Sequence, residues 1–250
     1  MITVKDVYQL IDSHAPFASQ MPGDHSGLQV GALSRPVSKV LVALDMSNDL
    51  VDEALERGCD LIVTHHPFIW NPLPDLDEDM YAQSLVARLV REGISYIAAH
   101  TNVDGAPEGH NVTLAKMLDG KITGRWPQEE CVVLFDLEPI LMSELLHKVQ
   151  DRIDPRAYAV GQEKIVTRAA VCSGAGGSDE LVGPILEDGR VYISGEFKHH
   201  QLRYADDIGG NLIGFGHFRS EIIFTNIMAE WLAPHVEVVK SRQQDPGVLR

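Results

Sequence analysis

Four histidines of this 250-residue chain come directly after apolar runs that have the length and composition of buried strands. His65 and His66 follow CDLIVT (59–64), His100 follows ISYIAA (94–99), and His217 follows NLIGFG (211–216). In α/β proteins the carboxyl ends of the strands form the crevice that holds ligands. The sequence therefore predicts that three separate strands bring imidazoles to one edge of a sheet.

His65 and His66 are adjacent, and adjacent side chains on a strand point to opposite faces. We therefore expect the pair to lie in the turn after the strand, where successive side chains can converge. A single histidine at a strand end is more often a hydrogen-bonded structural residue, so the case for a ligand site depends on the set.

Carboxylates accompany these histidines at fixed spacing. Asp104 lies four residues after His100, and Glu221 lies four residues after His217. A helix that begins at about Phe218 would place Glu221 in its first turn, facing back toward His217. Imidazoles and carboxylates together are ligands for zinc, manganese, iron, cobalt or nickel.

Two adjacent histidines cannot easily share one small ion with three further ligands. Each can instead hold one of two ions that a carboxylate bridges, at a separation of roughly 3.5–4 Å. The spacing thus predicts a dinuclear metal site.

The elements that would position this site alternate between strand and helix, which is typical of a mostly parallel α/β sheet. Strands are expected at 38–45, 59–64, 94–99, 131–137, 167–172, 191–195, 211–216 and 235–240. Helices are expected at 3–14, 48–58, 79–93, 108–120, 141–153, 179–187, 198–209 and 219–234. Thr3 and Asn48 are the predicted N-caps, and Gly58 is a predicted helix stop.

Composition narrows the classes of partner. The formal net charge is −15, which argues against a nucleic-acid backbone or an anionic membrane as the main partner. The three cysteines form no CxxC pair, the N-terminus lacks the pattern of a signal peptide, and every apolar run is too short to span a bilayer. We expect a cytoplasmic protein without a membrane partner.

Several segments together resemble the Nif-three-like family, often labelled GTP cyclohydrolase 1 type 2 homologue. They run in the family's order over nearly the whole chain: GLQVG (27–31), LIVTHHPFIW (61–70), AAHTNVDGAPEGHNVTLA (98–115), VCSGAGGS (171–178), ISGEFKHHQ (193–201) and GHFRSE (216–221). The resemblance implies a dinuclear centre with two divalent ions per subunit, of zinc, iron, manganese, cobalt or nickel. Its implied metal ligands are His65, His66, Asp104, His217 and Glu221.

The resemblance also implies two similar α/β domains with mixed, mostly parallel sheets flanked by helices, and a homohexamer built as a trimer of dimers. Because ligands come from both ends of the chain, we expect a discontinuous metal-binding domain of residues 1–123 and 190–250. Residues 124–189 would form the second domain.

Other residues are candidates for contact with a substrate. The family usually has an aromatic residue, Asp and Asn before GLQVG, whereas this chain has Gly23, Asp24 and His25. Asp24 is predicted to reach the crevice, and Lys198 and His199 are predicted to bind substrate. The turn SGAGGS (173–178) fits either an anion-binding loop or close packing.

The pattern favours a metal-dependent hydrolase with His100 as the catalytic proton-transfer residue. The resemblance to the family implies that its substrate is a small, nucleotide-like molecule. Two alternatives remain open: a phosphoesterase, and a non-catalytic metal-binding adaptor or scaffold.

Overall fold

The sheet that carries three of the four strand-end histidines has five strands, in the order β13-β4-β5-β6-β2. The structure, a computed structural model, describes residues 2–247. The strands are β2 (Gly27–Val30), β4 (Lys39–Ala43), β5 (Leu61–Thr64), β6 (Ser95–Ala98) and β13 (Glu237–Lys240). β13, β4, β5 and β6 run parallel, and β2 pairs antiparallel with β6. All four parallel strands therefore end at the same edge.

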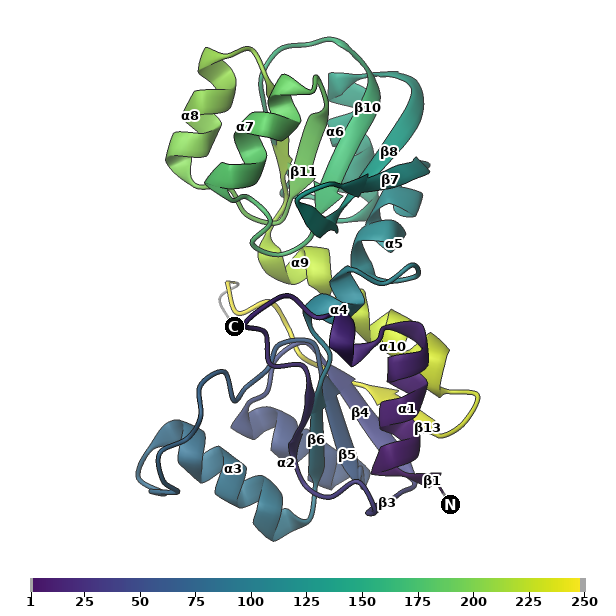
Figure 1. Cartoon of the computed structure of the whole chain (residues 1–250), viewed down its shortest axis with the longest axis vertical. Coiled ribbons are helices and arrows are strands. Elements are labelled where there is room, and N and C mark those ends of the chain that lie inside the picture. The colour runs from purple at the N-terminus through teal and green to yellow at the C-terminus, as the bar shows by residue number, and fades with distance from the viewer. Residues whose placement is uncertain (1, 248–250) are drawn as a thin grey trace. The chain divides into compact units, whose positions relative to one another are not determined.

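Alternation along β4 shows why helices cover both faces of this sheet. Val40 and Val42 pack with α1 (Val4–His14) and α10 (Phe224–Leu232) on one face. Leu41 and Ala43 pack with helices α2 (Asn48–Arg57) and α3 (Tyr81–Glu92). Figure 1 shows these two helices on the other face of the sheet. Since successive strand residues point to opposite faces, a run of consecutive apolar residues such as 40–43 needs cover on both faces of the sheet.

The observed ends of helices α1 and α2 agree with the predicted capping residues, with one exception. Thr3 caps α1, and Asp6 completes a capping box. The N-cap of α2 is Ser47, whose side chain accepts a hydrogen bond from the Leu50 N–H, so the prediction of Asn48 was wrong by one residue. Gly58 ends α2 in the left-handed conformation, as predicted (φ 66°).

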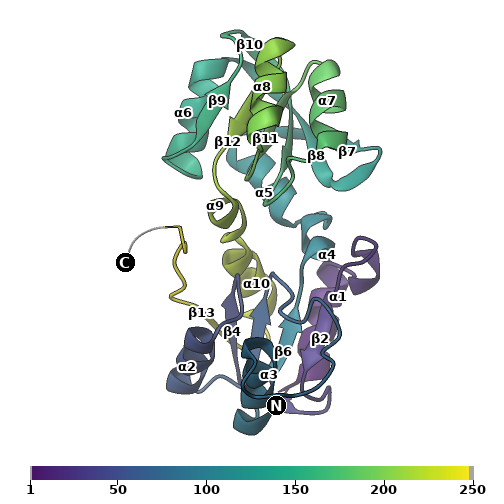
Figure 2. The ribbon, with the colours of Figure 1, turned by 90° about the vertical axis from the view of Figure 1, so that its left-hand side faces the viewer.

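The second sheet has six strands, in the order β7-β8-β10-β11-β12-β9. They are β7 (Lys121–Trp126), β8 (Glu129–Leu141), β9 (Tyr158–Val160), β10 (Ile165–Cys172), β11 (Val191–Ser194) and β12 (Asn211–Gly214). Here only the β10–β11 and β11–β12 pairs are parallel. The helices α7 (Asp179–Glu187) and α8 (His199–Asp207) cover one face, while α5 (His110–Met117) and α6 (Met142–Arg152) contact β8 (Figure 2).

The predicted α/β class, with mixed sheets flanked by helices, is confirmed. Three strands of the two large sheets were not predicted, β2, β7 and β9, and neither were the two-residue strands β1 (Ile2–Thr3) and β3 (Pro36–Val37). The region expected as one helix at 219–234 contains two, α9 (His217–Glu221) and α10. The remaining short elements are α4 (Thr101–Asp104) and the 3₁₀ turn Phe17–Ser19.

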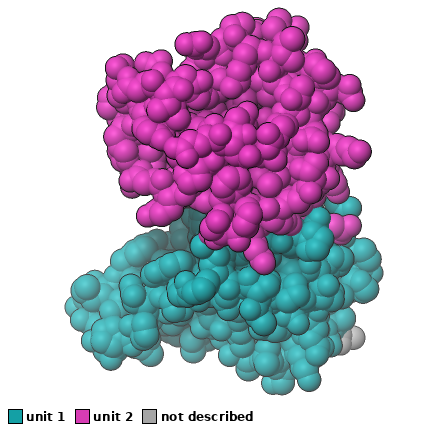
Figure 3. Space-filling model, turned by 45° about the horizontal axis from the view of Figure 1, so that its top comes forward, with its two compact units in different colours: residues 1–107, 222–250 teal, residues 108–221 magenta. Residues whose placement is uncertain are grey.

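The chain divides into two units, which Figure 3 colours separately. Unit 1 comprises the residues up to Pro107 and those from Ile222 onward, and unit 2 comprises Glu108–Glu221. These boundaries differ from the predicted division at 123/124 and 189/190. The physical reason is that β7, β11 and β12 form ladders within the six-stranded sheet, so the segments on both sides of 124–189 belong to unit 2.

No helix in the described part of the chain combines the length and the hydropathy that crossing a lipid bilayer requires.

A partly exposed turn of unit 1 gives a test of the fold. Asp60 accepts hydrogen bonds from the Ser38 N–H (2.7 Å) and hydroxyl and from the Lys39 N–H (3.1 Å), which join the start of β4 to the start of β5. Burial raises the pKa of the Asp60 carboxyl, but the hydrogen bonds lower this pKa by more than burial raises it. The net pKa is therefore below its ordinary value.

We expect Asp60→Asn to lower the free energy of unfolding at pH 7 by about 1–3 kcal/mol, measured by chemical denaturation. Because the folded-state pKa is depressed, the stabilisation is present above the unfolded pKa of roughly 3.9 and is lost as pH falls through the folded value. The difference between the variant and the wild type should therefore shrink in acid. Asp151→Asn, at an exposed position of α6, is the control and should change little.

Candidate metal centre

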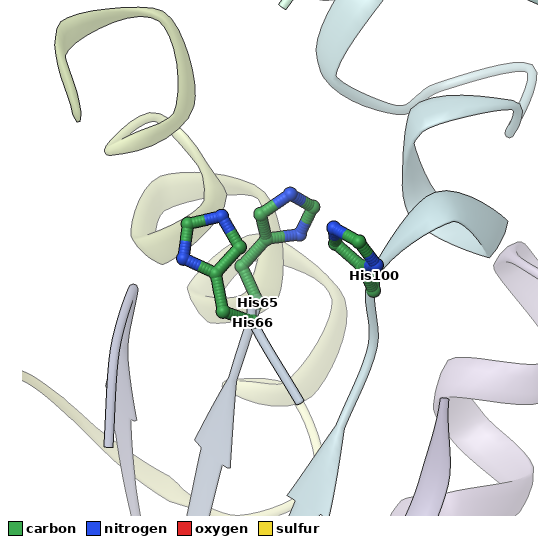
Figure 4. Close-up of side chains that lie close together, drawn as sticks. All are labelled: His65, His66 and His100. Carbon is green, nitrogen blue, oxygen red and sulfur yellow. The ribbon is translucent and has the colours of Figure 1, made fainter. Parts of the chain in front are cut away.

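The carboxyl ends of β5 and β6 bring three histidines together in unit 1. Figure 4 shows His65 and His66 after one strand and His100 after its neighbour. One ring nitrogen from each residue lies within 4.8 Å of one from each of the others. The ring centroids of His65 and His100 are 4.9 Å apart, and those of His65 and His66 are 5.0 Å apart. The predicted convergence of the adjacent pair in the turn is seen.

The same ring atom, Nδ1, is held by an oxygen in all three imidazoles. His65 Nδ1 bonds to the Ala99 carbonyl (3.0 Å), and His66 Nδ1 to Asp45 Oδ1 (2.6 Å). His100 Nδ1 bonds to Asp24 Oδ1 (2.9 Å). A carbonyl or an ionised carboxylate can only accept, so each Nδ1 must carry the proton. In the neutral rings Nε2 is then the atom with the lone pair, which is the state that a metal ligand needs.

The backbone of the histidine turn is fixed by the buried hydroxyl of Tyr96. This hydroxyl donates to the His66 carbonyl (2.9 Å), accepts from the Phe68 N–H (3.0 Å) and lies 2.8 Å from the Thr64 hydroxyl. The Thr64 hydroxyl also donates to the His66 carbonyl (2.8 Å). Burial raises the pKa of Tyr96 well above its ordinary value, so the group remains a neutral donor.

Asp24 holds the ring of His100 in place by a hydrogen bond between its carboxylate and Nδ1. Its side chain is 2% exposed and accepts from His100 Nδ1, the His25 N–H (2.7 Å), the Thr101 N–H (3.1 Å) and the Thr101 hydroxyl. Burial raises the pKa of this carboxyl, but the hydrogen bonds from His100 and Thr101 outweigh it and hold the pKa well below its usual range. Asp24 is therefore an ionised partner of His100.

Asp104, the first predicted carboxylate ligand, lies at the end of α4 in the same unit. Its Oδ1 is 3.8 Å from His65 Nε2, and its side chain is 11% exposed. The described residues of unit 1 thus gather four of the predicted site residues, with Asp104 facing Nε2 of His65: His65, His66, His100 and Asp104.

The other two predicted ligands lie together in unit 2. His217 and Glu221 are the first and last residues of α9, and His217 Nε2 is 2.9 Å from Glu221 Oε2. His217 Nδ1 is 3.1 Å from Glu196 Oε1. The i, i+4 spacing on a helix therefore pairs these residues as predicted, and a carboxylate again faces Nδ1.

The glycine-rich turn 173–178 packs against this pair. Gly174 has φ +57°, and its N–H donates to the Ser220 hydroxyl (2.8 Å). A Cβ at Gly174 would overlap Glu221 Oε1 and approach His217 Nε2 to 3.3 Å. The turn needs glycine here for close approach and for a positive φ.

The three predicted substrate contacts occupy different settings. Asp24 is buried under His100, whereas Lys198 and His199 are exposed at the start of α8 in unit 2. Their roles in substrate binding stay predictions.

Sequence reasoning missed Asp45 and Gln243. Asp45 lies two residues after the end of β4, at the same edge as the histidines, so the argument from strand ends would have found it. Gln243 follows β13 at that edge, and its Oε1 accepts from the N–H groups of Leu44 and Asp45 (both 3.0 Å). Its Nε2 donates to the Asp45 carbonyl (3.2 Å). No motif marks this glutamine in the sequence.

The fold and the histidine cluster define a class: a two-unit α/β protein with a candidate metal centre at the carboxyl edge of a parallel sheet. Residues 2–246 match the model of the Duf34/NIF3 (NGG1p interacting factor 3) family, and the chain belongs to that family. The resemblance noted in the sequence is confirmed.

Individual relatives agree with this placement. The chain is 29% identical over 229 residues to the GTP cyclohydrolase 1 type 2 homolog of Campylobacter jejuni, covering 91% of this chain and 90% of the relative. Among solved structures it is similar to reduced HcgD from Methanocaldococcus jannaschii, with a TM-score of 0.87, 25% identity, and 97% and 98% of the two chains covered. The protein ybgI gives a TM-score of 0.87 at 24% identity, with 98% and 100% covered.

The packing of Gly174 against Glu221 can be separated from backbone strain with a matched pair of variants. Gly189 also has a positive φ (78°), but a Cβ there would meet no atom within 4 Å. We expect Gly189→Ala to lower the free energy of unfolding by about 1 kcal/mol. Gly174→Ala should cost about 1–3 kcal/mol more, because the methyl group has to displace Glu221. Equal losses in urea denaturation would show that Glu221 is not confined by this turn.

Proposed function

We propose that the chain binds two divalent metal ions per subunit and hydrolyses a small, nucleotide-like molecule. The proposed ligands are the five that the resemblance implies: His65, His66, Asp104, His217 and Glu221. Zinc, iron, manganese, cobalt and nickel all suit nitrogen and carboxylate donors.

The observation that carries the proposal is the shared orientation of three imidazoles. A structural histidine needs only one satisfied hydrogen bond, and three that happened to be neighbours would not need to use the same ring atom. Here Nδ1 is the anchored atom in His65, His66 and His100. In the proposed ligands His65 and His66 this arrangement leaves the Nε2 lone pair for a metal ion, which is how metal-binding histidines are oriented in proteins. In His100 it leaves Nε2 to accept a proton.

A pair of divalent ions supplies positive charge that polarises a substrate oxygen and makes an attacking water more acidic. The chain's own residues supply the proton transfer. His100 Nε2 accepts the proton, while ionised Asp24 holds Nδ1–H and stabilises the imidazolium that forms. In this proposal the substrate-binding role predicted for Asp24 is exerted through His100.

The substrate class is inferred from the relatives. The Campylobacter jejuni relative is named a homolog of GTP cyclohydrolase 1 type 2, and a Helicobacter pylori relative at 29% identity bears that name without the word homolog. Lys198 and His199 are the proposed contacts for the polar part of such a substrate. The homohexamer is likewise proposed from the resemblance, and light scattering tests it.

A second candidate is a metal-binding adaptor without turnover. The family's description favours it, because it names an interacting factor and no reaction. A catalytic site must leave a coordination position open to substrate, whereas a structural site is closed by protein ligands. Turnover by the metal-loaded protein decides between the two candidates.

The carboxylate behind His66 provides a test of metal binding. Asp45→Asn puts an amide opposite Nδ1 and removes the acceptor charge, so the ring is held less firmly and is less basic. We expect metal affinity to fall about 10- to 100-fold, measured by titrating zinc into chelator-treated, dialysed protein in a calorimeter. Asp49→Asn, at an exposed position of α2, should bind zinc as the wild type does. Unchanged affinity in Asp45→Asn would contradict the assigned orientation of His66.

Turnover is tested with metal-loaded protein and a panel of nucleoside triphosphates and phosphoesters. His100→Ala should lower kcat about 10²- to 10⁴-fold while the protein still takes up metal. His235 is exposed, and His235→Ala is the control variant, which should retain activity. Release of phosphate without opening of the base ring would identify a phosphoesterase. Tight metal binding with no turnover on any member of the panel would favour the adaptor.

A further inference from the structure

A large aromatic side chain stands partly in solvent beside the histidine cluster. Trp70 is 45% exposed, and its ring centroid is 5.9 Å from that of His100 and 5.4 Å from that of His25. Both rings meet the indole at a steep angle, 82° and 80°, so neither is stacked on its face. An indole that the fold leaves partly in water is well suited to stacking against a flat ligand.

The segments that carry these two rings are held in place by one side chain. Gln29, in β2, accepts from the Ile69 N–H (2.8 Å) through Oε1 and donates through Nε2 to the carbonyls of Ile69 (3.2 Å) and His25 (2.9 Å). Trp70 follows Ile69 directly. One amide thus connects the backbone at Ile69, next to Trp70, to the backbone at His25. Because this segment is ordered before a ligand arrives, less entropy is lost when a ligand binds to the indole.

The surface formed by Trp70 and His25 is connected to the candidate metal centre through Asp24. Its Oδ1 accepts from the His25 N–H and from His100 Nδ1. The residue that orients the proposed proton-transfer group therefore also positions His25. A ring that stacked on Trp70 would lie against His100, next to the atoms that do the chemistry.

We propose that Trp70, supported by His25 and Gln29, is a stacking platform for a planar, conjugated ring of the ligand that binds at the histidine cluster. His25 stands where the family motif has asparagine, so the pairing of Trp70 with a histidine is a feature of this chain's own sequence. The inference deepens the proposed function, on which it rests for the identity of the site. It assigns the ring of the ligand to unit 1, beside His100.

The test measures ligand binding by calorimetry with guanosine, which has a planar bicyclic ring, and ribose 5-phosphate, which has none. Trp70→Ala should weaken guanosine binding roughly 10- to 100-fold, because stacking on one aromatic side chain has about that effect. Trp70→Phe should recover most of the affinity. Tyr81→Ala, which removes another exposed aromatic of unit 1, should have no effect. Ribose 5-phosphate should not distinguish the variants.

Equal guanosine affinity in wild type and Trp70→Ala, or no guanosine binding to the zinc-loaded wild type, would overturn the platform. Each titration is repeated on metal-free protein, and zinc affinity is measured separately for every variant. If the wild type holds no zinc but Trp70 still governs guanosine binding, the metal-dependent hydrolase fails and the platform stands. If zinc binds and guanosine does not, the platform alone fails.

Discussion

The site depends on hydrogen bonds to Nδ1 of neighbouring imidazoles. Each bond decides which ring nitrogen carries the proton and how the ring is turned, and the acceptors are a backbone carbonyl for His65 and carboxylates for His66 and His100. Unanchored imidazoles packed this closely could adopt either tautomer and several orientations. With the anchors in place, His65 and His66 present their Nε2 lone pairs before any ion arrives, which lowers the cost of organising a metal site, and His100 presents Nε2 for proton transfer.

The parallel sheet of unit 1 explains how these partners meet. In the order of the strands, β13 leads to Gln243, β4 to Asp45, β5 to His65 and His66, and β6 to His100. Each parallel strand is thus followed by a residue that is hydrogen-bonded to the segment after, or before, a neighbouring strand at this edge. β2 runs in the opposite direction, so the segment before it, with Asp24, completes the row. A shift of one strand's register would remove its member from this row.

Much of this could be read from the sequence because strand-end histidines and i, i+4 carboxylates are local patterns. The apolar runs before His65 and His100 predicted their convergence, and the spacing of His217 and Glu221 predicted their pairing. The support could not be predicted in the same way. Gln243 lies 198 residues from Asp45, and Tyr96 looks like any apolar strand residue until the fold places its hydroxyl under the His66 carbonyl. The predicted division differs from the two units because the cut at 123/124 falls within β7, which pairs with β8, and the cut at 189/190 separates β10 from its ladder partner β11.

The positions that orient the cluster and the position that meets a ligand ring differ in their surroundings. Asp24 and Tyr96 are buried or nearly so, and each has several partners, so most substitutions there would leave a polar group unsatisfied. Trp70 instead is 45% exposed, on a segment whose backbone at Ile69 is hydrogen-bonded to the Gln29 side chain. Its side chain can change without disturbing those bonds. The same scaffold can therefore keep one metal-binding geometry while the rim changes the ligand that it selects, and the two properties can be separated by mutation.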